Sequence, residues 1–418
     1  MGAPERRAFL KRSAAAALGL MARPLGAKAH RGTAPDSQWH TAAANVGASP
    51  KFKVFLAGDV MTGRGIDQIL PHASPPPIRE PYMRSARGYV QLAERANGPI
   101  PRPAGFAYVW GDALEVLDRA APDVRVINLE TAVTRSEDWA AKGINYRMHP
   151  ENVACLTAAR LDCCVLANNH VMDFGQSGLD ETLRTLHDVG LKTAGAGRNR
   201  QQADSPALLP VAGKGRVLVF AFGARSSGIP AEWAADTNKP GISLLPDLTE
   251  RTAQRIARLV AAVKGSGDIA LASIHWGGNW GYAVPSEQRH FAHRLIDTAA
   301  VDIVHGHSSH HPRGIEVYRS KPILYGCGDL LNDYEGIGAE EQLRPDLALM
   351  YFVTMAMPNG SLDSLEMVPM QIRRFRLYRA SAKDCAWLTA TLDRECARLG
   401  SRVARHTEHS LVLRWHPA

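Results

Sequence analysis

Side chains that bind metals or carry protons stand at the ends of five apolar segments of this sequence. The segments are short and continuously apolar, as expected of strands covered on both faces. They end, in chain order, at Asp59, Glu130, Asn169 with His170, His275, and the group His305, His307, His310 and His311. Because the strands of an open α/β sheet present their carboxyl ends to one crevice, these side chains are expected to converge. Carboxylate, carboxamide and imidazole ligands suit manganese, iron or zinc and differ from a thiolate site.

Each of these motifs has a simpler interpretation when it is taken alone. A single histidine after a strand, such as His275, is more often hydrogen-bonded in a core than bound to a metal. Asp59 could cap the next turn, Glu130 could be a carboxylate at a helix N-terminus, and Asn169 could be an ordinary turn residue. The four histidines within 305–311 could belong to a solvated loop. The repeated position at strand ends is what favours a shared cation site.

The elements that carry these residues alternate between strands and helices. Strands are predicted at 52–57, 124–128, 162–167, 215–222, 268–274, 301–304, 314–318 and 322–326. Helices are predicted from about 150 and over 176–188, 247–263 and 286–299. In the second of these helices the spacing of Leu179, Leu183 and Leu186 gives one apolar face. Such alternation is typical of an α/β fold in which central sheets are flanked by helices.

The chain divides into segments of different composition. The predicted divisions are a linker at 30–50, a main domain at 51–338 and a small α+β extension at 339–418. Within the main domain, the proline-rich segment 71–106 is predicted to be a long ordered loop. The extension is predicted to contain a hairpin with a Pro-Asn-Gly turn and a helix over 381–399.

The N-terminus resembles a twin-arginine export signal. The sequence RRAFLK at 6–11 precedes a short Ala/Leu segment, and Ala27-Lys28-Ala29 gives the small-x-small pattern of a cleavage site. We therefore expect residues 1–29 to be removed and the mature protein to be periplasmic or extracellular. The alternative is a flexible basic tail.

Most of the positive charge lies in that N-terminal segment. The chain of 418 residues has a net charge of +8, and the first 29 residues contain six Lys or Arg and one Glu, so the remainder carries +3. No basic stripe with interleaved aromatic residues occurs in the rest of the sequence. With 45% hydrophobic and 22% charged residues the chain reads as an ordinary globular protein, and no nucleic-acid partner is predicted.

The six cysteines include no Cys-x-x-Cys pair, which disfavours a zinc ribbon or a thioredoxin-like site. Cys163 and Cys164 lie in an apolar strand and are predicted to be core residues. Disulfide pairing does not follow from the spacing.

Five motifs follow one another along the chain at the strand ends described above. They are GDVMTGR, NLETAVT, NNHVMDFGQSGLDETL, HWG and GHSSHHPRGIEVYRSKPILYGCGDLLND, and together they span about residues 53–335. In this order they resemble the CapA family of poly-γ-glutamate capsule synthesis proteins, which is related in fold to calcineurin-like metallophosphoesterases. The resemblance implies a layered fold of that type and one or two divalent cations, manganese, iron or zinc.

The resemblance also implies a role for each candidate residue. The first cation would be bound by Asp59 and His310, the second by Asn169, His275 and His307, and Glu130 would bridge the two. His170 would act as an acid or stabilise a phosphate. A pair of cations of this kind activates a bridging water and neutralises charge on the attacked centre.

Two positions depart from the phosphoesterase pattern, although both substitutions are usual in the CapA family. Met61 stands where a histidine ligand is usual, and Glu130 replaces the usual Asp. Because a thioether is a poor ligand for a hard or borderline cation, we expect the first site to be weaker, empty or completed by another residue.

Asp173 and Arg64 are the remaining candidates for the site. Asp173 could complete the first cation site, or it could orient His170 or cap the following helix. Arg64, five residues after Asp59, could present its guanidinium group to a phosphate or carboxylate, or form a surface ion pair.

Two functions are compatible with this sequence. The first is an exported metal-dependent hydrolase or transferase that acts on an anionic substrate, either a phosphate ester or a poly-γ-glutamate amide bond. The second is a non-catalytic accessory protein that uses the same crevice to bind an anionic polymer during capsule assembly or export. In both cases capsule-synthesis machinery at the membrane is an expected partner. The pair Asn169-His170 favours catalysis, and Met61 favours binding or a single cation.

Overall fold

The computed structural model describes residues 50–338, 340–357 and 359–416. The predicted export signal at 1–29 and all but the last residue of the predicted linker at 30–50 lie outside the described residues. Within the described part, no helix is long and apolar enough to cross a bilayer.

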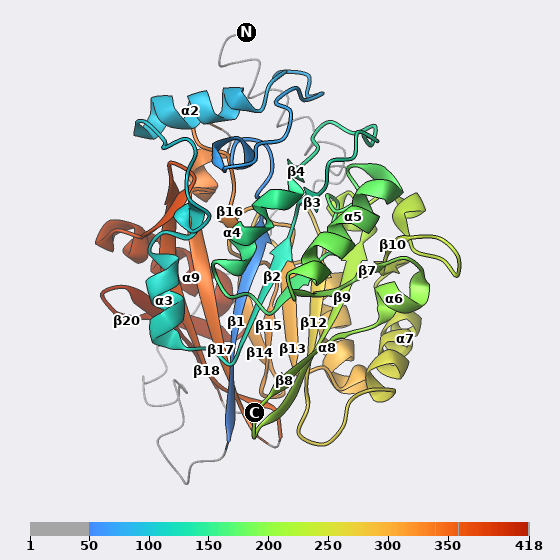
Figure 1. Cartoon of the computed structure of the whole chain (residues 1–418). Helices are drawn as coiled ribbons and strands as arrows, with labels where there is room; N and C mark the ends of the chain where they lie inside the picture. The colour runs from blue at the N-terminus through green and yellow to red at the C-terminus, as the bar shows by residue number, and fades with distance from the viewer. Residues whose placement is uncertain (1–49, 339, 358, 417–418) are drawn as a thin grey trace, which may run out of the picture.

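Two large β-sheets stand at the centre of the molecule (Figure 1). The first has the strand order β20-β21-β18-β17-β1-β2-β5-β6, with β16 paired to β1 and β19 to β18. Its strands are β1 (Lys51–Val60), β2 (Val124–Leu129), β5 (Cys163–Val165), β6 (Lys192–Ala194), β16 (Asp329–Leu331), β17 (Leu347–Ala356), β18 (Ser361–Arg373), β19 (Arg376–Arg379), β20 (Ser401–Thr407) and β21 (Ser410–Trp415). β1, β2, β5 and β6 run parallel, so their carboxyl ends share one edge.

The second sheet has the order β11-β9-β12-β13-β15-β14, with β8 paired to β9. Its strands are β8 (Ala207–Val211), β9 (Gly215–Ala224), β11 (Leu244–Leu245), β12 (Ile269–His275), β13 (Ile303–His307), β14 (Ile315–Tyr318) and β15 (Lys321–Leu324). The central strands β9, β12, β13 and β15 are parallel. Two small sheets are formed by β3 (Ala132–Val133) with β4 (Arg147–Met148), and by β7 (Ala196–Gly197) with β10 (Gly241–Ile242).

Helices cover the outer faces of both sheets, which gives four layers. In β1, Val54 and Leu56 join the core between the sheets, whereas Phe55 and Ala57 join the core under the helices, as the alternation of a strand requires. The helices over the first sheet are α2 (Arg87–Asn97), α3 (Ala113–Ala120), α4 (Ala154–Thr157) and α5 (Gly175–Asp188). The second sheet is covered by α7 (Glu250–Ala261) and α8 (Ser286–Ala299), while α6 (Arg200–Asp204) packs on β7 and α9 (Ala382–Ala397) on β20.

Short 3₁₀ helices occur in the connections. They are Asp67–Ile69, Tyr108–Trp110, Pro150–Val153, Arg225–Ser227, Ala231–Trp233 and Glu341–Leu343.

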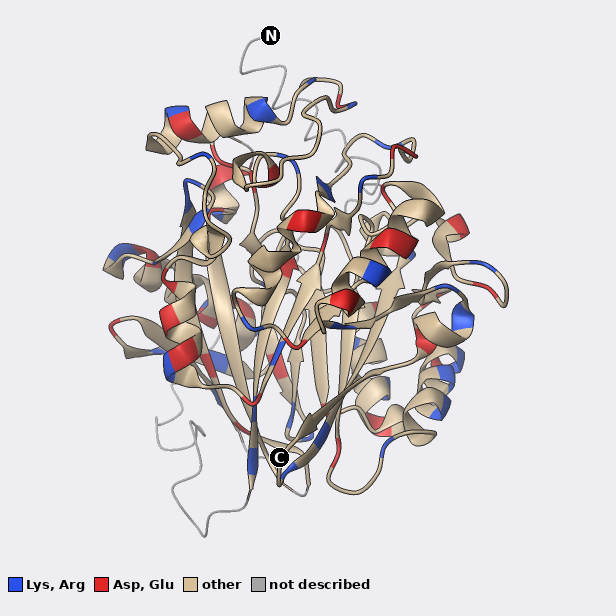
Figure 2. Cartoon of the chain, viewed as in Figure 1, with Lys and Arg blue, Asp and Glu red and all other residues tan. Residues whose placement is uncertain are grey.

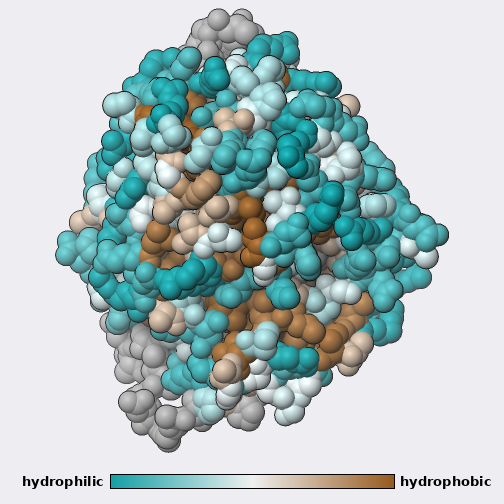
Figure 3. All heavy atoms as spheres, viewed as in Figure 1, coloured by the Kyte–Doolittle hydropathy of each residue, from teal (hydrophilic) through white to brown (hydrophobic). Residues whose placement is uncertain are grey.

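Charged residues gather on the helices and loops, and the central strands are largely apolar. Figure 2 shows both signs of charge interspersed along the outer helices, with few charged positions on the central strands. Hydrophilic residues accordingly cover most of the face seen in Figure 3, with hydrophobic residues visible in patches across its middle and lower part. Burial of the strands from both sides is what allows their continuous apolar sequences.

The predicted α/β architecture is confirmed, with several differences in its elements. The segment 71–106 contains α2, whose Tyr89, Val90 and Ala93 are buried, so the prediction of a loop throughout was wrong. The helix predicted from about 150 is a single turn, α4, after a 3₁₀ turn. Several elements were not predicted, among them α3, β8, β16, β20 and β21.

The hairpin predicted after 340 is present as β17 and β18, although Pro358 in its turn lies outside the described residues. β17 pairs antiparallel with β1, from Lys51 opposite Ala356 to Leu56 opposite Tyr351. The C-terminal strands therefore continue the first sheet of the main fold.

Candidate metal centre

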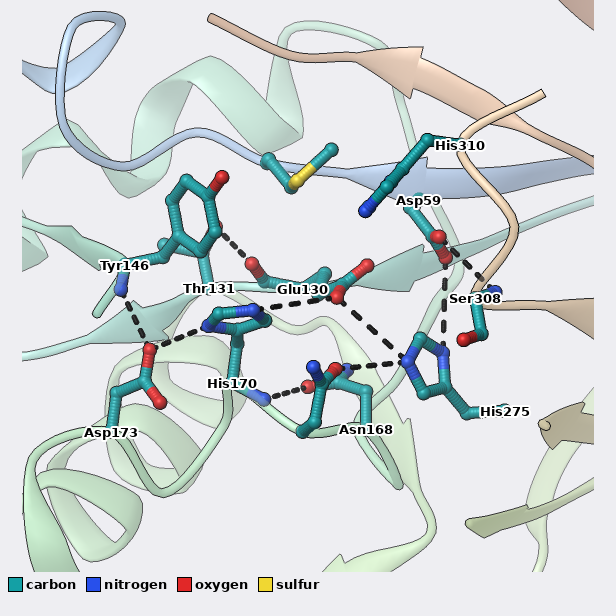
Figure 4. Close-up of polar contacts among 12 residues, drawn as sticks. Asp59, Glu130, Thr131, Tyr146, Asn168, His170, Asp173, His275, Ser308 and His310 are labelled. Carbon is teal, nitrogen blue, oxygen red and sulfur yellow. Dashed lines mark hydrogen bonds and ion pairs between the residues drawn. The ribbon is translucent and has the colours of Figure 1, made fainter. Parts of the chain in front are cut away.

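The carboxyl ends of strands from both sheets meet at one place, and their side chains point toward one another (Figure 4). The first sheet supplies Asp59 from β1, Glu130 after β2, and Asn169 and His170 after β5; the second supplies His275 from β12, His307 from β13 and His310 just beyond it. The structure thus brings together all the residues that the sequence analysis assigned to metal binding.

Asp59, His275 and His307 form a compact group of ligand atoms. Nδ1 of His275 lies 2.8 Å from Nδ1 of His307, and these nitrogens lie 3.9 and 3.8 Å from Oδ1 of Asp59. All three side chains are buried. Metal–ligand bonds of about 2.0–2.2 Å place neighbouring ligands about 3–3.5 Å apart, so one cation can be surrounded by these atoms.

Asp59 also belongs to a second group, with His310 and Asp329. Nδ1 of His310 lies 2.9 Å from Oδ1 of Asp329, whose Oδ2 accepts a hydrogen bond from Asn332 at 2.8 Å. Asp329 is the first residue of β16 and lies beside Asp59 in parallel register. A carboxylate to which the sequence analysis gave no role therefore stands at the site.

Glu130 and Asn169 present oxygen atoms to the same space. Oε1 of Glu130 lies 3.7 Å from Nε2 of His170 and 3.8 Å from Nε2 of His275, and its buried Oε2 has no hydrogen-bond partner among the described residues. Oδ1 of Asn169 lies 2.9 Å from Nε2 of His275. An unpartnered buried carboxylate oxygen is costly unless a cation compensates it, so Glu130 fits the metal-binding role.

The electrostatics of the site also fit a divalent cation. Burial, reinforced by the carboxylate of Asp329, raises the pKa of Asp59 to about 7. Burial and the nearby Asp59 raise the pKa of Glu130 well above its usual range. Burial lowers the pKa values of His275 and His307 well below the usual range, which keeps these imidazoles neutral and able to coordinate. A divalent cation would favour the ionised carboxylates and bind the neutral imidazoles, so this donor set matches manganese, iron or zinc.

His170 is held from behind by Asp173. Its Nδ1 lies 2.7 Å from Oδ2 of Asp173, which also accepts a hydrogen bond from the backbone N–H of Tyr146 at 2.7 Å. Nζ of Lys142 lies 2.7 Å from the other Asp173 oxygen and also donates to the backbone carbonyl of Asn169. With Nδ1 engaged, Nε2 of His170 faces Glu130. Asp173 thus orients His170, one of the three roles considered for it, and its contacts do not place it in the first cation site.

Arg64 is buried in an ion-pair network and does not take the predicted position facing a ligand. Its guanidinium group donates to both carboxylate oxygens of Asp333, to Glu80 at 3.0 Å and to the hydroxyl of Tyr89 at 3.0 Å. It also lies over the ring of Tyr146, 4.5 Å from the centroid. These contacts engage the guanidinium edge that a substrate anion would need, and they differ from the surface ion pair considered as the alternative.

Met61 is buried at the edge of the second group. Its sulfur lies 3.6 Å from the hydroxyl of Tyr334, which in turn lies 3.4 Å from Nε2 of His310. The thioether therefore lies in the neighbourhood of His310.

A ladder of amide side chains positions the candidate ligands from the first sheet. Asn168 accepts hydrogen bonds from the backbone N–H groups of His170 and Val171 and so holds the turn that aims His170. It also donates to Asn128 at 2.9 Å, and Asn128 donates to Oδ1 of Asp59 at 2.7 Å. The position of Asn128 at the end of β2 was a signal that could have identified it.

Stacked sheets flanked by helices, with nitrogen and oxygen ligands at their carboxyl ends, define a metallophosphoesterase-like α/β protein. Residues 53–334 match the family described as bacterial capsule synthesis protein PGA_cap. The chain belongs to this family, which includes the CapA proteins and lies in the calcineurin-like superfamily.

The names of curated relatives refer to the synthesis of a polymer or a capsule. The chain is 51% identical over 362 residues to a probable polyglutamine synthesis accessory protein of Mycobacterium tuberculosis, covering 86% of this chain and 95% of the relative. It is 26% identical over 342 residues to the capsule biosynthesis protein CapA of Bacillus anthracis, covering 80% and 74%. It is 28% identical over 215 residues to the PGA biosynthesis protein CapA of Bacillus subtilis, covering 51% and 54%.

Proposed function

We propose that this chain is an exported accessory protein of capsule or polyglutamate synthesis whose metal centre hydrolyses or transfers a bond in an anionic substrate. The proposal rests on the convergence of four candidate ligands, Asp59, Glu130, His275 and His307. Beside them lies His170, whose imidazole is held by the carboxylate of Asp173. The relatives' names support the link to capsule polymers.

The chemistry divides between the cation and the protein. A divalent cation bound at this centre would supply Lewis acidity and a metal-activated water. His170 supplies the proton transfer: Asp173 fixes Nδ1, and burial lowers the pKa of His170 to about 4, so its Nε2 is an unprotonated acceptor at neutral pH. In this geometry His170 takes a proton at Nε2 and returns it to a leaving group.

The substrate class follows from the ligands. Hard and borderline cations with imidazole and carboxylate ligands polarise phosphoryl and carbonyl oxygens, so a phosphate ester and a γ-glutamyl amide are both suitable substrates. Capsule-synthesis machinery at the membrane is the proposed partner.

The cysteines are consistent with export of an already folded protein. All six are free and buried, and burial raises the pKa of each thiol. Such a fold does not depend on disulfide formation in an oxidising compartment. The twin-arginine pattern at 6–11 supports the same route.

A second candidate function is polymer binding without catalysis. It is favoured by Met61, whose buried thioether stands near His310 in place of an imidazole. A centre that binds the first cation only weakly would still attract a polyanion through the second cation.

The test combines metal content and activity in the mature protein, residues 30–418. Wild type, His307→Ala and Asn169→Ala would be measured for bound manganese, iron and zinc by mass spectrometry, and for hydrolysis of a generic phosphodiester and of poly-γ-glutamate. His293→Ala is the matched control, because it removes a partly buried imidazole on α8 that pairs with Glu316.

We expect stoichiometric metal and activity in the wild type and in the control, and loss of both in the two ligand variants. Stoichiometric metal without activity on either substrate would favour polymer binding. Absence of stoichiometric metal after incubation with each cation would contradict the proposed metal centre.

A further inference from the structure

His305 is a buried histidine at the metal centre that neither the proposed ligand set nor the proposed chemistry uses. It belongs to the histidine-rich segment 305–311 and lies two residues before His307 on β13, on the same side of the strand. It is fully buried, and its two ring nitrogens contact Ala57 of the first sheet and Ser273 of the second.

The contact with Ala57 fixes which nitrogen of His305 carries the proton. Nε2 lies 3.0 Å from the backbone carbonyl oxygen of Ala57. A carbonyl oxygen can only accept, so Nε2 is the donor. Among the described residues, no carboxylate is hydrogen-bonded to either nitrogen of His305. A charged imidazole between two apolar sheets is strongly disfavoured. His305 is therefore neutral, and its Nδ1 carries a lone pair.

The proton position on His305 determines, through Ser273, which nitrogen of His307 is protonated. Nδ1 of His305 lies 3.0 Å from Oγ of Ser273, so the hydroxyl must donate its single proton to that lone pair. Oγ of Ser273 lies 2.9 Å from Nε2 of His307 and, with its proton already used, can only accept there. Nε2 of His307 is then protonated, and Nδ1 is the nitrogen with the free lone pair.

That lone pair points into the centre, 2.8 Å from Nδ1 of His275 and 3.8 Å from Oδ1 of Asp59. The series of hydrogen bonds thus begins at the backbone carbonyl of Ala57, which can only accept, and runs through His305 and Ser273 to His307. It leaves Nδ1 of His307 without a proton. We propose that Ser273 and His305 are positioning residues that lock His307 in the tautomer able to bind the cation. This inference rests on the proposed metal centre, but the tautomer itself exists without metal.

The first experiment reads the tautomer directly in metal-free mature protein. Histidine labelled with ¹⁵N distinguishes a protonated from an unprotonated ring nitrogen by chemical shift, and the His307 signals would be assigned with a His307→Gln variant. We expect Nε2 of His307 protonated and Nδ1 unprotonated. A protonated Nδ1 in the wild type would overturn the relay, whatever the protein does with metals.

The second experiment measures Mn²⁺ and Zn²⁺ affinity by calorimetry in Ser273→Ala, Ser273→Thr and Ser401→Ala. Removing a group that orients a metal-bound imidazole costs about 10–100-fold in metal affinity, so we expect a loss of that size in Ser273→Ala. Ser273→Thr retains the hydroxyl and is expected to recover affinity to within about threefold of the wild type. Ser401→Ala removes a buried hydroxyl that bonds the Ile315 carbonyl elsewhere, and it should bind metal like the wild type.

The outcomes separate the two proposals. If the wild type binds neither cation, the proposed metal centre fails while the tautomer measurement still decides the relay. If the wild type binds metal and Ser273→Ala binds it equally well, the relay has no function and the inference is wrong. If Ser273→Ala does not fold, the comparison of Ser273→Thr with the wild type and the ¹⁵N shifts still decide it.

Discussion

The residues of the candidate metal centre differ from ordinary core residues in their surroundings. His275 and His307 face each other with their Nδ1 atoms 2.8 Å apart, close enough for one cation or one proton to lie between them. Oε2 of Glu130 is buried and has no hydrogen-bond partner among the described residues. A cation between the two imidazoles would bind both nitrogens, and a cation near Glu130 would compensate its unpartnered oxygen.

The first prediction concerns Met61, which stands where the sequence analysis noted that phosphoesterases usually have a histidine ligand. Met61→His would place a nitrogen ligand two residues after Asp59, in the neighbourhood of His310. We expect the affinity for a second zinc or manganese ion to rise by about tenfold or more, because an imidazole binds these cations far better than a thioether. Titration calorimetry of the mature protein measures it.

Met357→His serves as the control, since Met357 is buried just after β17 and packs in the core between the sheets. Equal cation stoichiometry and affinity in wild type and Met61→His would show that the space around His310 is not a cation site.

Most site residues could be predicted from the sequence because they directly follow apolar strands. Asp59, Glu130, Asn169, His275 and His307 all have this local signal. Asp329 lacked it, because it reaches the site only through the pairing of β16 with β1, a contact between residues 270 positions apart. The burial of Arg64 against Asp333 and Glu80 likewise depends on segments distant in the chain.

Among the elements, β1 and the turn before β16 approach each other closely at the metal centre. The backbone N–H of Asp59 donates to the carbonyl of Gly328 at 2.9 Å, and a Cβ at Gly58 would lie 1.8 Å from that same oxygen. The glycine at 58 is therefore what allows Asp59 and Asp329 to stand side by side.

Gly58→Ala is accordingly expected to destabilise the fold. Backbone atoms would have to move, which costs about 3 kcal/mol or more of the free energy of unfolding. Urea unfolding measures the change. Gly105→Ala is the matched control, because no heavy atom lies within 4 Å of a Cβ built there. A loss below about 0.5 kcal/mol in Gly58→Ala would contradict this description of the strand contact.

A second element-scale prediction concerns the ion pairs that tie the start of β17 to α9. Arg344 donates to both oxygens of Asp346 at 2.7 and 2.8 Å and to Asp384 in the first turn of α9 at 2.8 Å. Although burial raises the pKa of Asp346, the hydrogen bonds from Arg344 and Gln371 lower it overall.

A carboxyl group with a lowered pKa in the folded state stabilises the protein above its unfolded pKa, and this contribution is lost as the pH falls through the folded value. Arg344→Gln should therefore lower the free energy of unfolding by about 0.5–1 kcal/mol at pH 7. This loss should become smaller as the pH falls below about 4. Urea unfolding at a series of pH values measures it. Arg319→Gln, which removes an exposed pair with Asp297, is the control. A cost that persists unchanged at pH 3 would contradict the assignment.

The elements that sequence reasoning missed lacked a clear local pattern. α2 lies in a proline-rich segment and is followed by Gly98, which has a positive φ of 88°. β20 has polar or charged residues at most of its positions, and its place depends on pairing with β21. In both cases packing against distant segments, which a single sequence does not display, decided the structure.

At the scale of the whole molecule, the sheet that carries the metal centre is completed by the C-terminal strands. β1 lies between β2 and β17, and β17 and β18 contribute Leu349, Val353 and Met367 to the core between the sheets. The sequence predicted the hairpin but not its continuity with β1, because nothing local indicates which strand a hairpin joins.

A chain that ends at residue 338 is therefore expected not to fold. It would leave β1 as an open edge with its apolar face uncovered. The mature chain 30–418 is the control, and the two would be compared for soluble yield and for a cooperative thermal transition. A cooperative transition in the shortened chain would show that the segment 51–338 is an independent domain, as the sequence division proposed.

The central claim is that a divalent cation sits where the two sheets meet. The most direct measurement is anomalous X-ray scattering from crystals of the mature protein grown with Mn²⁺. The account predicts an anomalous peak within coordination distance of Asp59, His275 and His307, about 2.0–2.3 Å from their ligand atoms. Crystals grown in millimolar Mn²⁺ that show no peak there, or show one bound elsewhere, would contradict it.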